Sequence, residues 1–124
     1  MGKFVVKKVP TGIKFVLKAD NDQVILDSEV YNAEPGVLNG IDSVRRCCGG
    51  AVEDQTVENF EVKTNPKYEI YLDKAGEYRF RLKAKNGQII GASEGYKSLD
   101  NCMNGIESVK ANAPEAELVR EDLE

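Results

Sequence analysis

The sequence contains no histidine among its 124 residues. This absence excludes Ser-His-Asp triads, Cys-His pairs and every metal or haem site that depends on imidazole ligands. The three cysteines are an odd number without the spacing of a disulfide framework, and two of them, Cys47 and Cys48, are adjacent. We therefore expect reduced, non-structural cysteines and a cytoplasmic location, and we predict no cofactor and no metal site.

Long apolar runs are also missing. No stretch approaches the roughly 18 residues that a membrane-spanning helix needs, and lysines interrupt the N-terminal residues 1–8, which lack the apolar region of a signal peptide. Positive charge is not in excess, because 17 Lys and Arg residues stand against 21 Asp and Glu residues, for a net charge of −4. This balance gives little support to generic polyanion binding. We expect a soluble globular protein without a membrane partner.

The most informative feature that is present is an internal repeat. Residues 13–44, shifted by 65 positions, align with residues 78–109, and 15 of the 32 aligned pairs are identical. A lone half of the chain would bury too little surface to be stable, so the two halves should share one core. We therefore predict two repeats, residues 1–64 and residues 65–124, within one compact domain.

The second copy gives the clearer pattern of strands. Apolar and polar residues alternate through residues 68–73 and residues 78–85, and a third strand is expected at residues 88–93. The pair Asn86-Gly87 before the third strand predicts a two-residue type I′ turn. The three strands should form an antiparallel meander with one apolar and one charged face.

A helix is predicted after these strands. Ser98 is a suitable N-cap, and apolar residues recur at spacings of three and four as far as Ala113. Pro114 should end the helix, because proline cannot continue it. Residues 116–120 then predict a short further strand.

The first copy has the same order of elements. Three strands are predicted, beginning at Phe4, at Ile13 and at Val24. A helix follows, with an apolar stripe from Val37 to Cys48. Another strand is expected either at residues 51–54 or at residues 60–62, and the pattern alone does not rank these two positions.

The order β-β-β-α with a short β to follow therefore occurs twice and predicts an α+β fold. Each set of three strands presents one apolar face, which a single helix would cover. We predict one antiparallel sheet with two helices on one face, the two repeats being related by a pseudo-twofold axis. Because the twofold interface would already be made within the chain, we expect a monomer.

Three blocks of the second copy resemble a known family. Residues 78–90, residues 93–96 and residues 104–109 are similar to the YegP-like family of small, mostly bacterial proteins of unknown function. The resemblance covers nearly the whole chain, twice over. It implies tandem β3-α-β repeats in one continuous sheet, with the last strand of each repeat swapped into the other half. The family brings no established active site, so the resemblance implies no catalytic residue.

The block Asn-Gly-Ile-x-Ser-Val lies within both predicted helices, where glycine costs about 1 kcal/mol relative to alanine. In a structural interpretation, which we favour, Gly40 and Gly105 let each helix approach the sheet or the other helix closely, while Asn39 and Asn104 hydrogen-bond a neighbouring loop. In a functional interpretation, two polar ridges meet at the pseudo-twofold axis and line a small groove, because residues four apart share a helix face. The ridge residues are Asn39, Ser43, Asn104 and Ser108.

A second repeated block, Ser-Glu-x-Tyr, connects the third strand to the helix in each copy and contains Tyr31 and Tyr96. We favour a structural turn, in which the serine and glutamate bind loop N–H groups and the tyrosine ring packs on the helix. The alternative is a binding loop that includes both tyrosines.

The outward face of the middle strand is basic in the second copy, where it carries Arg79, Arg81 and Lys83. Sheet faces with basic and aromatic residues hold single-stranded nucleic acid in some domains. The chain is acidic overall and has few aromatic residues, so we favour a solvated face. Cys48 falls on the apolar helical stripe, which favours burial over a redox or metal-binding role.

No nucleophile in the sequence has a base beside it, and we predict no catalytic residue. We therefore favour a non-enzymatic binding or interaction module, whose ligand or protein partner the sequence does not identify. Two alternatives remain open. One is a nucleic-acid-binding protein that uses the basic sheet face, and the other is a small enzyme that works without histidine.

Overall fold

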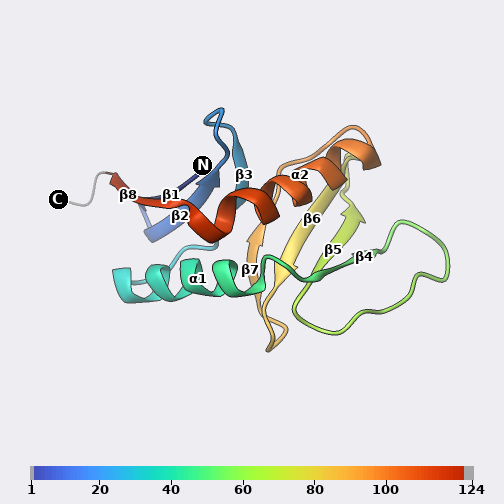
Figure 1. Ribbon diagram of the computed structural model, residues 1–124, viewed down its shortest axis with the longest axis horizontal. Helices are drawn as coiled ribbons and strands as arrows, with labels where there is room; N and C mark the ends of the chain where they lie inside the picture. Colours follow the sequence, from blue (N-terminus) through green and yellow to red (C-terminus); the bar gives the residue numbers. More distant parts are fainter. Residues whose placement is uncertain (1, 122–124) are drawn as a thin grey trace.

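Two helices lie over one face of an eight-stranded sheet in the computed structural model, which describes residues 2–121 (Figure 1). The strands are β1 (Lys3–Val9), β2 (Gly12–Lys18), β3 (Val24–Asp27), β4 (Ala51–Asp54), β5 (Lys67–Leu72), β6 (Tyr78–Lys83), β7 (Ile89–Ala92) and β8 (Glu117–Glu121). The helices are α1 (Glu34–Cys47), α2 (Leu99–Asn112) and the short 3-10 helix η1 (Ala113–Glu115). The order of strands across the sheet is β4-β5-β6-β7-β3-β2-β1-β8.

The sheet is mixed, so the predicted wholly antiparallel sheet is wrong. The strands within each set of three pair in antiparallel fashion, whereas β8 pairs with β1 and β4 pairs with β5 in parallel. The physical reason is that no tight turn joins the two strands of either parallel pair. The loop of residues 55–66 returns the chain from the end of β4 to the start of β5, and β1 and β8 lie far apart in the chain.

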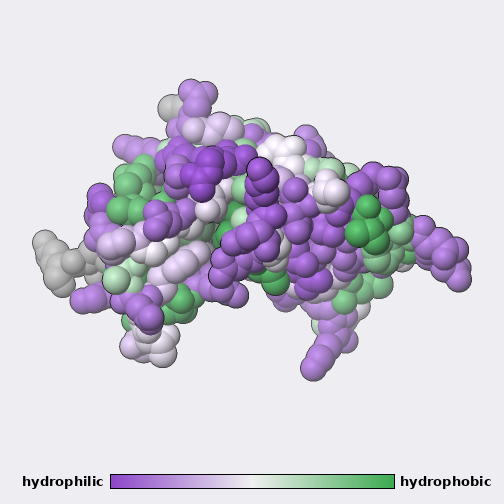
Figure 2. Space-filling model, turned by 90° about the horizontal axis from the view of Figure 1, so that it is seen from below, coloured by the Kyte–Doolittle hydropathy of each residue, from purple (hydrophilic) through white to green (hydrophobic). Residues whose placement is uncertain are grey.

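The structure also decides between the two positions predicted for the last strand of the first copy. The strand is β4 at residues 51–54, whereas residues 60–62 belong to the loop between β4 and β5. This loop carries apolar side chains into solvent, and Val62 is 72% exposed. Seen from below, the surface of the molecule is mostly hydrophilic, with hydrophobic residues in separate patches (Figure 2).

The turn between β6 and β7 is not the predicted type I′ turn. That turn needs positive φ at both central residues, but of the pair Asn86-Gly87 only Gly87 has one, at 84°. Ala84 exchanges hydrogen bonds with its neighbours across the turn, donating to the carbonyl of Gln88 at 2.9 Å and accepting from the N–H of Gly87 at 2.9 Å. This is a three-residue turn with a bulge. Asp22 takes the place of Gly87 in the first copy, with a φ of 66°.

The signals that were predicted for the second helix are present. The side chain of Ser98 accepts a hydrogen bond from the backbone N–H of Asn101 at 3.1 Å, which makes Ser98 the N-cap of α2. The α-helix ends before Pro114, which lies in η1. Each helix packs on strands of both repeats, because α1 contacts β2, β6 and β7 while α2 contacts β3 and β6. The two halves therefore share one core.

Arg45 of α1 holds the segment that leaves α2. Its guanidinium donates hydrogen bonds to the backbone carbonyls of Ala113 at 3.3 Å, Pro114 at 3.1 Å and Ala116 at 2.9 Å. The same group lies 5.0 Å from the ring centroid of Phe4 in β1. Carbonyl groups at a helix end lack intrahelical partners, so this arginine satisfies them and fixes the path of the chain into β8.

A tyrosine ring sets the height of each helix above the sheet. The ring of Tyr31 stacks on Phe15 and the ring of Tyr96 stacks on Phe80, each with centroids 6.4 Å apart. A Cβ atom placed on the helical Gly105 would lie 2.8 Å from Cζ of Tyr96 and 3.1 Å from Phe80. The structural interpretation of these glycines therefore has a specific partner, which is the tyrosine ring rather than the other helix.

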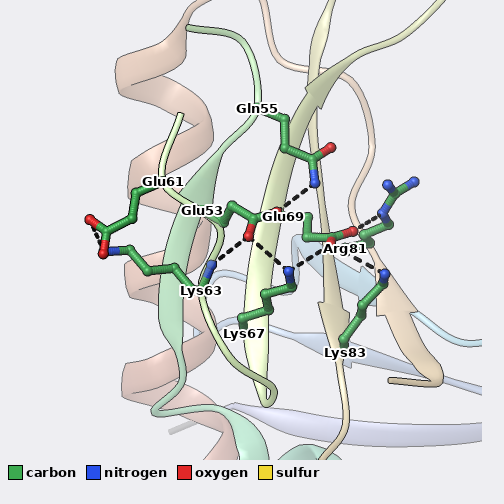
Figure 3. A network of polar contacts seen from close by, with 8 residues as sticks. All are labelled: Glu53, Gln55, Glu61, Lys63, Lys67, Glu69, Arg81 and Lys83. Atoms are coloured by element: carbon green, nitrogen blue, oxygen red, sulfur yellow. Dashed lines mark hydrogen bonds and ion pairs between the residues drawn. The ribbon is translucent and has the colours of Figure 1, made fainter. Parts of the chain in front are cut away.

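Glu53 of β4 ties the following loop to the sheet from a position that is only 2% exposed (Figure 3). Its carboxylate accepts hydrogen bonds from Lys67 Nζ at 2.8 Å, from the backbone N–H of Lys63 at 2.7 Å and from Gln55 Nε2 at 2.6 Å. A buried carboxylate is tolerated only when it is paired and hydrogen-bonded in this way.

We expect Gly105→Val to destabilise the protein by about 1–3 kcal/mol, because a branched side chain would overlap the ring of Tyr96. Gly40→Val should behave alike, since a Cβ there would lie 2.5 Å from the Tyr31 hydroxyl oxygen. Urea denaturation measures both. The matched control is Gly49→Val, because no atom lies within 4 Å of a Cβ at Gly49. Unchanged unfolding free energies for the two helix variants would contradict the packing role.

We expect the free energy of unfolding to decrease as the pH is lowered, because Glu53 is then protonated. Burial raises the pKa of this carboxyl, but the hydrogen bonds from Lys67, Gln55 and Lys63 outweigh burial and lower the pKa from 4.5 to about 2. A folded-state pKa below the unfolded value adds stability above pH 4.5, and this stability is lost as pH falls toward about 2. Urea denaturation across this range measures the loss, and Glu53→Gln should make the profile flatter. An identical slope in the variant would contradict the assignment.

Candidate functional site

Two grooves open where a helix from one repeat meets the hairpin turn of the other. The first has a volume of about 330 Å³ and lies between α2 and the β2–β3 turn. Its lining residues are Ala19, Asn21, Gln23, Ile25, Tyr96, Asn101, Asn104, Gly105 and Ser108. The second has a volume of about 250 Å³ and lies between α1 and the β6–β7 turn. Its lining residues are Glu29, Tyr31, Gly36, Asn39, Gly40, Ser43, Gln88, Ile89 and Ile90.

The two grooves correspond to each other under the 65-residue shift. Six pairs of equivalent positions carry the same residue type, and one member of each pair lines each groove. They are Tyr31 and Tyr96, Asn39 and Asn104, Gly40 and Gly105, Ser43 and Ser108, Gln23 and Gln88, and Ile25 and Ile90. We call this set the groove residues.

The polar ridges predicted from the sequence therefore lie in grooves, but they do not meet at a common axis. Asn39 and Ser43 line one groove, and Asn104 and Ser108 line the other. The reason is that each ridge faces the turn of the opposite repeat and not the other helix. The sequence analysis missed Gln23 and its counterpart, although their identity in both copies was a usable signal.

The groove residues offer neutral hydrogen-bonding groups. The amides of Asn39 and Asn104 are exposed, while Ser108 Oγ accepts a hydrogen bond from Asn112 at 3.2 Å. Burial raises the pKa of Tyr31, with a smaller contribution from the charge of Glu29. The phenol therefore stays protonated at neutral pH and can donate. Amides and hydroxyls bind polar molecules in both directions, as donors and acceptors.

The serines of the Ser-Glu-x-Tyr blocks have structural partners. Ser93 Oγ accepts from the buried N–H of Phe80 at 2.9 Å and donates to the carbonyl of Glu94 at 2.8 Å. Ser28 makes the equivalent contacts, accepting from the N–H of Phe15 at 2.9 Å. These hydroxyls satisfy backbone groups of the strands β2 and β6, whereas the structural interpretation had placed the serine and glutamate on N–H groups of the loop.

The basic face predicted from the sequence is partly exposed, and its cations lie in ion pairs. Arg81 Nε donates to Glu69 at 2.6 Å, Lys83 Nζ lies 3.2 Å from the same carboxylate, and Arg79 Nε donates to Asp73 at 2.6 Å. Glu69 is only 3% exposed, and the lysine beside it, Lys67, is 7% exposed. Partly buried ion pairs thus neutralise these cations, which the alternation of residues alone could not reveal.

The three cysteines lie in the core, in agreement with the burial predicted for Cys48. Burial raises the pKa of the Cys48 thiol and raises that of Cys102 to about 11. Thiols in this state react slowly, because the thiolate is the nucleophile. Across residues 2–121, no group of cysteine and acidic side chains could hold a metal ion. In the same part of the chain, no helix is long and apolar enough to cross a membrane.

Comparison with known proteins finds relatives that have no assigned activity. Residues 12–54 and residues 73–119 match the family described as a domain of unknown function, DUF1508. The UPF0339 protein YegP of Yersinia pestis is 41% identical over 113 residues, which are 90% of this chain and 88% of that protein. A UPF0339 protein of Methanosarcina acetivorans is 60% identical over 53 residues, which are 43% of this chain and 91% of that protein.

A solved structure supports the same relationship. The solution NMR structure of YegP from E. coli, described as a protein of unknown function, superimposes with a TM-score of 0.80 at 33% identity. The superposition covers 99% of this chain and 95% of that chain. The resemblance to the YegP-like family and the α+β fold are thereby confirmed. The chain belongs to the UPF0339 family, whose members include YegP and whose repeated unit here is the DUF1508 domain.

Proposed function

We propose that the protein is a non-enzymatic binding protein and that each groove holds one small, neutral, hydroxyl-bearing molecule. The observation that carries this proposal is the pair Asn39 and Asn104. Both amides are exposed in the interior of a helix, where asparagine is unfavourable, and within residues 2–121 neither has a hydrogen-bond partner. Asparagine nevertheless stands at this position in both copies, which supports a contact with a molecule outside the chain.

The positions next to these asparagines support the same conclusion. Val37 corresponds to Cys102, and Leu38 corresponds to Met103, so identity between the two helices is not general. Requirements of the core explain the unchanged glycine and tyrosine, because they touch each other. They do not explain an exposed amide.

The chemistry of the grooves favours a neutral ligand. In both grooves, amide and hydroxyl groups supply neutral donors and acceptors, and an isoleucine and the tyrosine ring supply apolar surface. Glu29 adds one carboxylate to the α1 groove, which disfavours an anion there. Volumes of about 250 Å³ and 330 Å³ are at the small end for ligand pockets. A sugar of one or two rings combines these properties, because hydroxyl groups alternate with apolar C–H faces.

The two alternative functions have less support. The grooves contain no nucleophile with a base beside it among the described residues, which argues against an enzyme that works without histidine. A nucleic-acid site on the sheet face would have to hold a polyanion beside the carboxylates of Glu69, Asp73 and Asp27, which would repel it.

NMR titration with glucose, maltose and N-acetylglucosamine tests the proposal. We expect at least one of these sugars to shift the side-chain amide signals of Asn39 and Asn104 in a saturable manner, because each amide would bond directly to a hydroxyl. Asn104→Ala should abolish the response in the α2 groove, leave the α1 groove unchanged and alter stability by less than about 0.5 kcal/mol.

Asn32→Ala is the matched control, since Asn32 is an exposed asparagine that lines neither groove. It should bind as the unchanged protein does. The proposal fails if none of the three sugars shifts either asparagine and native mass spectrometry of the purified protein detects only the bare chain.

We also propose that a pseudo-twofold axis relates the repeats, that the repeats exchange their last strands and that the chain is a monomer. The order of strands supports the exchange. β4 follows α1 of the first repeat but pairs with β5 of the second, and β8 follows α2 of the second repeat but pairs with β1 of the first.

A fragment that ends at Thr64 tests this exchange. It lacks β8, the strand that pairs with one edge of β1, and β5, the strand that pairs with β4. We therefore expect the fragment to be unfolded or to self-associate, as measured by the dispersion of its NMR spectrum and by light scattering. A well-dispersed spectrum from a monomeric fragment would refute the exchange.

A further inference from the structure

A third hollow, of about 370 Å³, lies on the face of the sheet that the helices leave uncovered. It forms where β7 meets β3 through the residue pair Asp27 and Ala92. Two arginines from β6, Arg79 and Arg81, line it, and because they are two residues apart they point to the same side of the strand. Tyr71 of the neighbouring strand β5 also lines this hollow.

Arg81 is held in one orientation by contacts on two sides. Its Nε donates to Glu69 at 2.6 Å, and its Cζ lies 4.6 Å from the ring centroid of Tyr71. The two terminal nitrogens point away from Glu69 (Figure 3). A guanidinium that is bound through Nε still presents two parallel N–H groups, which match the two oxygens of a carboxylate.

Arg79 is oriented in the same manner. Its Nε donates to Asp73 at 2.6 Å, and its Nη1 donates to the carbonyl of Ser93 at 3.2 Å. The hydrogen bond to Asp73 is the main cause that raises the pKa of this arginine, so it stays charged. Two cations that are fixed before binding lose little side-chain entropy when an anion arrives.

The fold does not require the charges of Arg81, Glu69 and Glu53, because the first repeat builds the same strands without them, although Arg79 corresponds to another cation, Lys14. The strand register shows which residues of β1, β2 and β8 occupy the positions equivalent to Glu69, Arg81 and Glu53, and all three are valines. The equivalent pairs are Glu69 and Val5, Arg81 and Val16, and Glu53 and Val119. Burying carboxylates costs free energy of solvation, so the second repeat carries a cost that the first avoids.

We propose that Arg79 and Arg81 form a binding site for the carboxylate group of a small organic acid. The apolar part of the acid would lie against Tyr71 and Ile89. Asp27 and Glu29 also line the hollow, and their charges disfavour dianions and polyanions. Lys14 pairs with Asp27 at 2.5 Å, which limits this repulsion to a degree that a monoanion tolerates. The site shares Glu29 and Ile89 with the α1 groove, but its two arginines lie outside both grooves, so it does not depend on the function proposed for them.

NMR titration with benzoate tests this site through the Nε–Hε signals of Arg79 and Arg81. Benzoate supplies one carboxylate and one apolar ring, and we expect saturable shifts of both signals in the millimolar range. Benzamide, which has the same shape without the charge, should leave these signals unchanged. Inorganic phosphate should bind more weakly than benzoate, because the acidic wall repels a dianion.

Substitutions can distinguish binding by the geometry of the two guanidinium groups from attraction by the net charge of the protein. Arg79→Gln and Arg81→Gln should each weaken benzoate binding by at least about tenfold, since each loses a charge-assisted hydrogen bond. Arg81→Lys should also weaken binding, because lysine cannot present two parallel donors. The matched control is Lys8→Gln, which removes the same charge from an exposed residue outside the hollow and should leave the affinity unchanged.

Three results would overturn the proposal. The first is that benzoate causes no saturable shift at either arginine of the unsubstituted protein while the NMR spectrum shows that the protein is folded. The second is an equal loss of affinity in Lys8→Gln and Arg81→Gln, which would indicate attraction by net charge. The third is displacement of benzoate by an eight-nucleotide oligothymidylate that binds more tightly, which would assign the face to nucleic acid.

Discussion

Each helix depends on a tyrosine ring that fills the space beside a glycine. The ring stacks on a core phenylalanine, and the absence of a side chain on the glycine lets the helix descend onto the ring. This contact fixes the thickness of the molecule between helix and sheet. It also determines what remains at the surface, because the asparagine that precedes the glycine is carried to the edge of a groove. One packing contact thereby couples the core to the site proposed for ligands.

The two halves use one backbone arrangement for two different surfaces. Around β1, the uncovered face of the sheet has Val5 and Val16, which are buried among their neighbours. Around β5, the same positions carry Glu69 and Arg81 in an ion-pair network that continues to Glu53 (Figure 3). The register of the strands is the same in both, so backbone pairing and the inner apolar face specify the fold. The uncovered face was free to diverge after the repeat arose.

Sequence reasoning succeeded for most of the local signals, although the turn type predicted from Asn86-Gly87 was wrong. The alternation from Tyr78 to Lys83, the N-cap Ser98 and the helix end before Pro114 each depend on residues close in the chain. It failed where distant segments decide the outcome. The parallel pairing of β4 with β5 depends on the path of the loop of residues 55–66, and the burial of Glu69 depends on cations from three other positions. The helical residues of the grooves were predicted, because they form a repeated pattern in the sequence. The turn residues were missed, because they come from the other repeat.

The contacts of Arg45 have a consequence for the order in which the protein forms during synthesis. This arginine belongs to the first helix, but the carbonyl groups that it binds belong to residues 113–116, close to 70 positions later in the chain. The outer edge of β1 likewise stays without its neighbour until residues 117–121 have left the ribosome. An unpaired strand edge is a template for association with other chains. The nascent first repeat therefore passes through a period of exposure that ends only when its last partner emerges, and fast elongation shortens that period.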